Sequence, residues 1–136
     1  PFEGHEGHAE RGAKIINEYI QDVVGKKKSE RIRKVVRNHH SEPETVEGRI
    51  LQDADLLTNY GVSNLWRMIH YSSEEERTME EAFEYFWDTH VPRYLDRLDE
   101  FNFSISTKWA RERMIKHQET VQRMEEEFDA EDRSTF

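Results

Sequence analysis

The chain has 136 residues and a net charge of −9, a length typical of one domain with a substantial core. It contains no cysteine, which excludes disulfides, thiolate zinc sites and a cysteine nucleophile. The acidic balance disfavours binding to duplex nucleic acid. Neither a signal peptide nor a long apolar run is apparent, so we expect a cytoplasmic protein without membrane contact.

Helical periodicity predicts two helices in the first forty residues. Apolar side chains between residues 8 and 24 recur at steps of three or four, the spacing of one helix face, and Gly25 ends this helix. Ser29 is a good N-cap for a second helix over residues 30–40. Between them the lysines that follow Gly25 are expected to form a polar link.

The middle of the chain has the pattern of two further helices. The third is predicted over residues 45–60 and the shorter fourth over residues 62–71. Apolar residues of the third helix lie on one stripe, which we expect to be buried. This stripe contains Val46, Ile50, Ala54 and Leu57.

Two long helical patterns complete the chain. Ser73 and Glu76 have the spacing of a capping box and predict the start of a fifth helix, which Pro92 kinks or splits. A sixth helix is predicted over residues 106–128, in which we interpret His117 as a solvated side chain. Residues 129–136 are expected to be a frayed tail.

No segment alternates with a period of two for long enough to form a strand. We therefore predict an all-α fold, a single compact domain of five to seven helices over residues 1–128.

Histidines and aspartates are the candidate chemical groups. His8 lies at the start of the first predicted helix, and His39 with His40 ends the second. Asp53 and Asp55 lie inside the third helix, where carboxylates are costly unless they are paired, hydrogen-bonded or bound to metal. Imidazole and carboxylate together suit Zn, Mn, Fe or Ni. The alternative is that an aspartate caps or pairs with a neighbouring helix.

Three strings carry a family resemblance: HAERGA from residue 8, VRNHH from residue 36 and QDADLL from residue 52. In their order along the chain, in the numbers of residues between them and in their helical context, these strings resemble the HD-domain superfamily of metal-dependent phosphohydrolases. The resemblance covers most of the chain, and the QDADLL string is its most specific piece. It implies an HD-domain-like fold and hydrolysis of a phosphorylated small molecule, either a phosphomonoester or a nucleotide.

The resemblance also assigns site residues by position. It places a metal-ligand aspartate at Asp55 and leaves Asp53 on the helix surface or beside the ligands. It implies that His8, His39 and His40 are catalytic-site residues, either as metal ligands or as contacts to the phosphate. The implied cofactor is a divalent metal ion: Mn, Mg, Fe, Ni, Co or Zn.

One part of the family pattern is absent from this sequence. The family has an early histidine and an adjacent His-Asp pair upstream of the position of His8, whereas this sequence contains no His-Asp dipeptide. We therefore expect that an amino-terminal segment is missing and that the chain by itself binds metal weakly. The alternative is a catalytically inactive HD-like helical module that regulates or binds a ligand.

A basic run follows the first predicted helix: Lys26, Lys27, Lys28, Arg31, Arg33, Lys34 and Arg37. Such a run is usually a solvated face. The functional alternative is a cationic rim that attracts a phosphorylated substrate.

Overall fold

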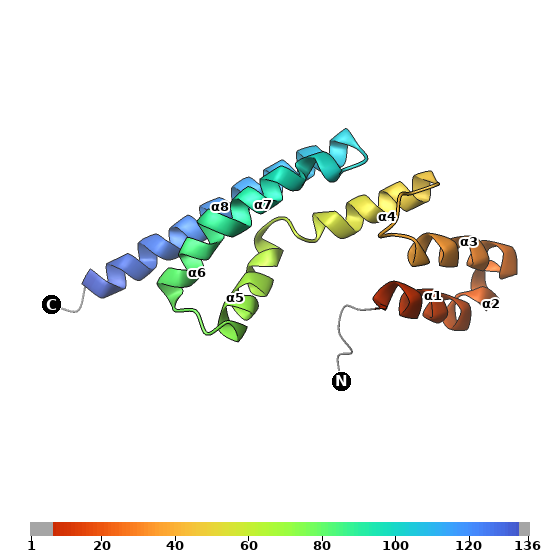
Figure 1. Cartoon of the computed structure of the whole chain (residues 1–136), viewed down its shortest axis with the longest axis horizontal. Helices are drawn as coiled ribbons and strands as arrows, with labels where there is room; N and C mark the ends of the chain where they lie inside the picture. The colour runs from red at the N-terminus through yellow and green to blue at the C-terminus, as the bar shows by residue number, and fades with distance from the viewer. Residues whose placement is uncertain (1–6, 134–136) are drawn as a thin grey trace. The chain divides into compact units, whose positions relative to one another are not determined.

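Helices joined by short turns make up the computed structural model, which describes residues 7–133 (Figure 1). No strand occurs within these residues, so the prediction of an all-α fold is confirmed. The α-helices are α1 (His8–Tyr19), α2 (Gln21–Val24), α3 (Lys26–Arg37), α4 (Val46–Leu57), α5 (Leu65–Glu74), α6 (Met79–Tyr85), α7 (Val91–Asp96) and α8 (Ser104–Arg133). Short 3₁₀ turns, η1 (Val62–Asn64) and η3 (Arg97–Glu100), and one π-helical segment, η2 (Phe86–His90), connect some of them.

The helices gather into two compact units, residues 1–54 and residues 55–136. The first unit contains α1, α2, α3 and most of α4, and the second contains the remaining helices.

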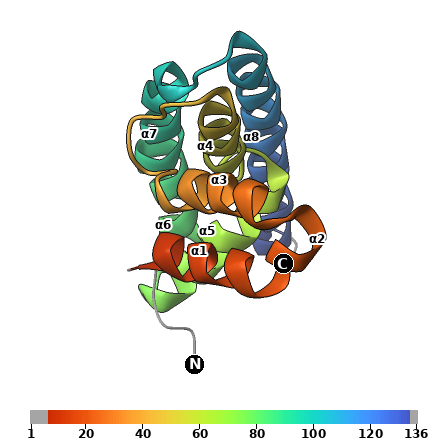
Figure 2. The same ribbon diagram turned by 90° about the vertical axis from the view of Figure 1, so that its right-hand side faces the viewer.

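In the first unit, α1 packs against α3, and the two helices lie side by side in both views (Figure 1, Figure 2). The contact is close at Gly12, where an added Cβ atom would lie 3.2 Å from a methyl carbon of Val36. Ala13 and Ile16 of α1 are buried, as is Ser29 of α3.

The boundaries in this unit differ from the predicted ones. The first helix is interrupted at Ile20, and α3 begins at Lys26, directly after Gly25. Because Gly25 has a φ of 78°, which favours glycine, the chain turns at this one residue. The lysines therefore form the first turn of α3 and not a link.

The predicted stripe of the third helix is mostly wrong. Residues 46, 50 and 54 are exposed, and only Leu57 of that set is buried. The buried positions are instead Asp53, Leu56, Leu57 and Tyr60, which recur at steps of three, four and seven. The buried face of α4 carries the carboxylate of Asp53. Because the prediction was based on apolar residues alone, it selected a neighbouring face of the helix.

The second unit has a core of apolar side chains that come from all its helices. Tyr60 is fully buried, and its hydroxyl group donates a hydrogen bond of 2.8 Å to the carbonyl oxygen of Tyr94. Burial raises the pKa of Tyr60 to about 12. Arg113 of α8 donates a hydrogen bond of 3.1 Å to the carbonyl oxygen of Leu57, at the end of α4.

The capping box lies five residues beyond its predicted place. Thr78 caps α6 by accepting a hydrogen bond from the backbone N–H of Glu81, and the Glu81 carboxylate accepts one from the backbone N–H of Thr78. Ser73 is instead inside α5, which continues to Glu74. The turn between these helices places Glu76 at a φ of 55°.

The last two helical patterns differ from expectation at their ends. Upstream of Pro92 the helix widens into the π-helical segment, and α7 then starts at Val91. At the other end, α8 continues to Arg133, so residues 129–133 are helical and not frayed. Ion pairs such as Arg123–Glu127, at 2.8 Å, support its last turns. Residues 134–136 lie outside the described part.

None of the helices in residues 7–133 is both long enough and apolar enough to cross a membrane.

Two histidines, His90 and His117, are buried in the second unit, which corrects the predicted role of His117. His117 is 0% exposed and not solvated, and its ring lies 4.8 Å from that of Phe86. His90 lies at the end of the π-helical segment, with its Nε2 atom 3.4 Å from the amide nitrogen of Asn64. Burial lowers the pKa of both histidines to about 4, and the charge of Arg93 adds to this effect at His90.

The second unit should therefore lose stability in mild acid. Each buried histidine has its usual pKa near 6.5 in the unfolded chain and a pKa of about 4 in the folded chain. The stability is fully present above pH 6.5 and is lost as the pH falls toward 4, by up to about 3 kcal/mol per histidine. We expect His117→Phe to reduce this loss, measured as the difference in unfolding free energy by urea titration at pH 7.5 and pH 5. His70→Phe is the control, because His70 is exposed. An unchanged pH dependence in His117→Phe would contradict the assignment.

A second stability prediction concerns the turn after α5. Glu76 adopts the left-handed conformation, which costs a non-glycine residue about 1 kcal/mol. Glu76→Gly should raise the unfolding free energy by up to about 1 kcal/mol. Glu75→Gly, at a φ of −88°, should lower it instead, because there glycine only adds unfolded-state entropy. Equal losses in both variants would show that the turn relaxes without strain.

Candidate metal centre

Three histidine side chains meet between the start of α1 and the turn after α3. The Nε2 atom of His8 lies 2.8 Å from Nε2 of His40 and 3.3 Å from Nε2 of His39. One nitrogen from each ring can be chosen so that all three lie within 4.8 Å of one another. Within residues 7–133 this is the one group of three or more potential metal ligands that lie this close together.

A backbone contact determines which nitrogen of His39 is free to bind a ligand. The Nδ1 atom of His39 lies 2.6 Å from the carbonyl oxygen of Val36. Because a carbonyl oxygen only accepts hydrogen bonds, we assign the ring proton of neutral His39 to Nδ1. Its Nε2 atom then carries a lone pair directed toward the other two rings, and the same backbone contact fixes the ring orientation.

The donor set fits a divalent transition-metal ion. Nitrogen ligands about 2.05 Å from one ion lie about 2.9 Å apart at a right angle and about 3.4 Å apart at a tetrahedral angle. The distances between the Nε2 atoms of His8 and His40 and of His8 and His39, 2.8 and 3.3 Å, match this range. Imidazole nitrogen suits Zn, Cu, Fe and Ni better than Mg or Ca. His8 and His40 are exposed, so water or a substrate could reach the remaining coordination positions.

An ion pair holds the two helices together beside the histidines. Arg37 donates to both carboxylate oxygens of Glu10, from Nε at 2.6 Å and from Nη2 at 3.0 Å. The hydrogen bonds from Arg37 keep the pKa of the Glu10 carboxyl below its usual value. Glu10 lies two residues after His8 and Arg37 lies two before His39, so this pair joins the two helices close to the histidines in the chain.

The sequence interpretation missed the role of Glu10. A glutamate in the first turn of a helix suggests a favourable dipole interaction and nothing more. Arg37 was predicted only as part of the basic run, and the structure places its guanidinium on Glu10. The only hint in the sequence is that Glu10 and Arg37 each lie two positions from a histidine of the cluster.

The two aspartates differ from the histidines in their placement. Asp53 is 3% exposed, so of its two expected positions the one on the helix surface is wrong, and the one beside the ligands stays a prediction. Asp55 is exposed and is the first residue of the second unit. The three-histidine cluster includes neither aspartate. The role of Asp55 as a metal ligand stays a prediction from the resemblance.

Comparison with known proteins supports the fold alone. No protein-family model matches the sequence, and no curated protein matches it. A crystal structure of Bacillus subtilis YpgQ in complex with ADP is similar, with a TM-score of 0.59 and 19% sequence identity over 85% of this chain and 60% of that chain. A second crystal structure of Bacillus subtilis YpgQ has a TM-score of 0.58 and 19% identity, over 85% of this chain and 62% of that one. The chain thus spans about three fifths of the length of these structural neighbours and shares their helical fold.

Proposed function

We propose that this chain is a metal-dependent phosphohydrolase that acts on a phosphomonoester or a nucleotide. The observation that carries the proposal is the convergence of three imidazole nitrogens at the end of the α1–α3 contact. A nucleotide substrate is supported by the similar fold of YpgQ, which has been solved in complex with ADP.

In this proposal His8, His39 and His40 hold the ion through their Nε2 atoms. A bound divalent ion supplies an acidified water and polarises a phosphoryl oxygen. Two contacts within the chain position these histidines. The hydrogen bond to the carbonyl oxygen of Val36 keeps the proton of His39 on Nδ1. The Glu10–Arg37 pair keeps the first turn of α1 against the last turn of α3. His8 and His40 are exposed, as contact with a phosphate in solution requires.

A catalytically inactive module that binds a ligand is the second candidate. It is favoured by the composition of the cluster, which contains no carboxylate, and by the lack of a His-Asp dipeptide in this sequence. Metal binding alone does not separate the two candidates, so the test of function is turnover.

Zinc binding tests the histidine cluster. We expect one Zn²⁺ ion per chain by isothermal titration calorimetry, and we expect His39→Ala to weaken binding by about 100-fold, since a ligand is lost. His70→Ala is the control, because His70 is exposed and paired with Glu74 in the second unit. Glu10→Gln should weaken binding by about tenfold through loss of positioning, whereas Glu18→Gln on the same helix should not. If His39→Ala binds as tightly as the parent chain, the site is wrong.

Phosphate release tests the function itself. With Zn²⁺, Co²⁺ or Mn²⁺ present, the chain should release phosphate from p-nitrophenyl phosphate or from ADP. His40→Ala should reduce the rate by at least about 100-fold, a loss of about 2.7 kcal/mol in transition-state stabilisation. Asp55→Ala should abolish activity if the resemblance assigns it correctly, and Asp53→Asn should retain part of it. Zinc binding without turnover of either substrate would favour the inactive module.

A further inference from the structure

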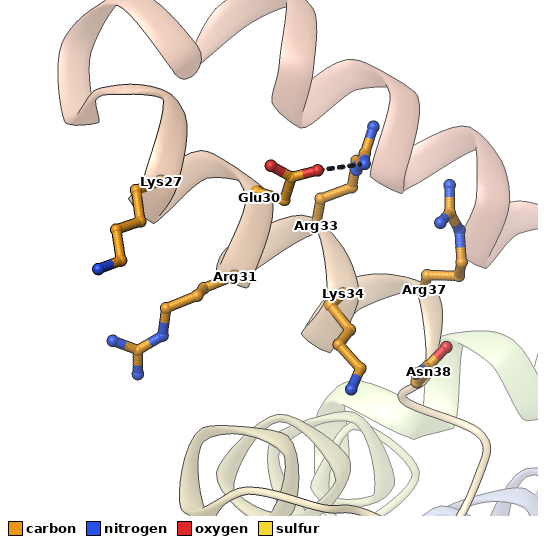
Figure 3. A pocket seen from close by; sticks show the side chains of 7 residues that line it. All are labelled: Lys27, Glu30, Arg31, Arg33, Lys34, Arg37 and Asn38. Carbon is orange, nitrogen blue, oxygen red and sulfur yellow. Dashed lines mark hydrogen bonds and ion pairs between the residues drawn. The ribbon is translucent and has the colours of Figure 1, made fainter.

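Lys27, Arg31 and Lys34 give α3 a cationic face that points away from α1, while Arg33 and Arg37 point toward α1 (Figure 3). A shallow pocket of about 570 Å³ lies along this helix, and five of its seven lining residues are basic. These are Lys27, Arg31, Arg33, Lys34 and Arg37. The lining ends at Asn38, which is adjacent in the sequence to His39 of the metal cluster.

The packing of α3 against α1 does not require Lys27, Arg31 or Lys34, whereas Arg37 is paired with Glu10 of α1. The other face of α3 contacts α1 through Ser29, which is buried, and Val36, which lies against Gly12. Lys27 and its two lysine neighbours occupy the first turn, where positive charges oppose the helix dipole and cost stability. Within residues 7–133 no ion pair to Lys27 is formed.

Arg31 and Lys34 have exposed carboxylate partners that a phosphate can replace. Arg31 lies 3.2 Å from Glu47, and Lys34 lies 2.6 Å from Glu44, with all four side chains at least 60% exposed. Ion pairs this exposed contribute little to stability. A phosphate group carries more charge than a carboxylate and matches the forked donors of arginine, so it competes well for these side chains.

We propose that the cationic face of α3 binds the phosphate groups of a nucleoside diphosphate. This inference rests on the proposed function and deepens it by naming the substrate class and the residues that select it. Lys27 and Arg31 are one helical turn apart on the same side of α3, so consecutive phosphates can contact both. The net charge of −9 for the whole chain favours a short anion over a long nucleic acid, which would meet acidic surface elsewhere.

The test compares ligands that differ only in phosphate number. Calorimetry at low salt should give tighter binding of ADP than of AMP, and of AMP than of adenosine. The double variant Lys27→Gln/Arg31→Gln should weaken ADP binding by about tenfold, leave adenosine binding unchanged and lose this effect at high salt. Its melting temperature at low salt should not fall, because Lys27 opposes the helix dipole and the Arg31 pair is exposed.

The matched control is Lys108→Gln/Arg111→Gln, which removes the same charge from exposed positions of α8 in the second unit. Equal weakening of ADP binding by the control would reduce the effect to net charge and overturn the proposal. Unchanged ADP affinity in the α3 variant would also overturn it. So would tighter binding of a 20-nucleotide single strand than of ADP through the same residues, since the ligand would then be a nucleic-acid backbone.

Zinc binding and hydrolysis of p-nitrophenyl phosphate, measured on the same α3 variant, separate this inference from the proposed function. Weaker ADP binding with no hydrolysis by any form of the chain supports the phosphate site and contradicts the hydrolase. Hydrolysis that depends on His40, with ADP affinity unaffected by the α3 variant, supports the hydrolase and overturns the phosphate site.

Discussion

The close contact between α1 and α3 is the constraint on which the candidate site depends. Gly12 lets the two helices approach, because a Cβ atom at this position would lie 3.2 Å from a methyl carbon of Val36. Glu10, two residues before Gly12 on α1, pairs with Arg37 of α3 and joins the same two helices. His8 then projects from one helix and His39 and His40 from the end of the other, so their nitrogens meet only while this contact holds. The geometry of the cluster thus depends both on this helix packing and on the turn after α3 that carries His39 and His40.

Helix α3 combines three roles along its length. Its inner face supports α1, its last turn and the residues after it carry two histidines and the carbonyl oxygen of Val36 that orients His39, and its outer face carries the cations. Lys27, Arg31 and Lys34 point away from α1 and can be substituted without touching the helix contact, whereas Arg37 is part of that contact through Glu10. A phosphorylated ligand that lies along α3 would approach the metal cluster from a cationic surface, and the electrostatic attraction of such a surface increases the rate of encounter.

The sequence predicted the helical class and the histidine cluster for different reasons. Periodicity was sufficient for the class, because apolar steps of three and four continue through most of the chain. The cluster came from a resemblance, since residues 31 or 32 positions apart carry no local sign that they meet. Burial was harder to predict: the inward face of α4 contains Asp53, and α8 buries His117, so a polar residue stands where periodicity expects an apolar one. Glu10 could not be identified either, because its partner Arg37 lies on another helix.

X-ray absorption at the zinc edge of the Zn²⁺-loaded chain tests the central claim most directly. The account predicts a shell of nitrogen or oxygen ligands at about 2.0–2.1 Å with the multiple-scattering signature of three imidazole rings. It also predicts that this signature falls to two rings in His8→Ala and stays at three in His70→Ala. A spectrum without imidazole scattering, or one that is the same in His8→Ala as in the parent chain, would contradict the assignment of the metal to this cluster.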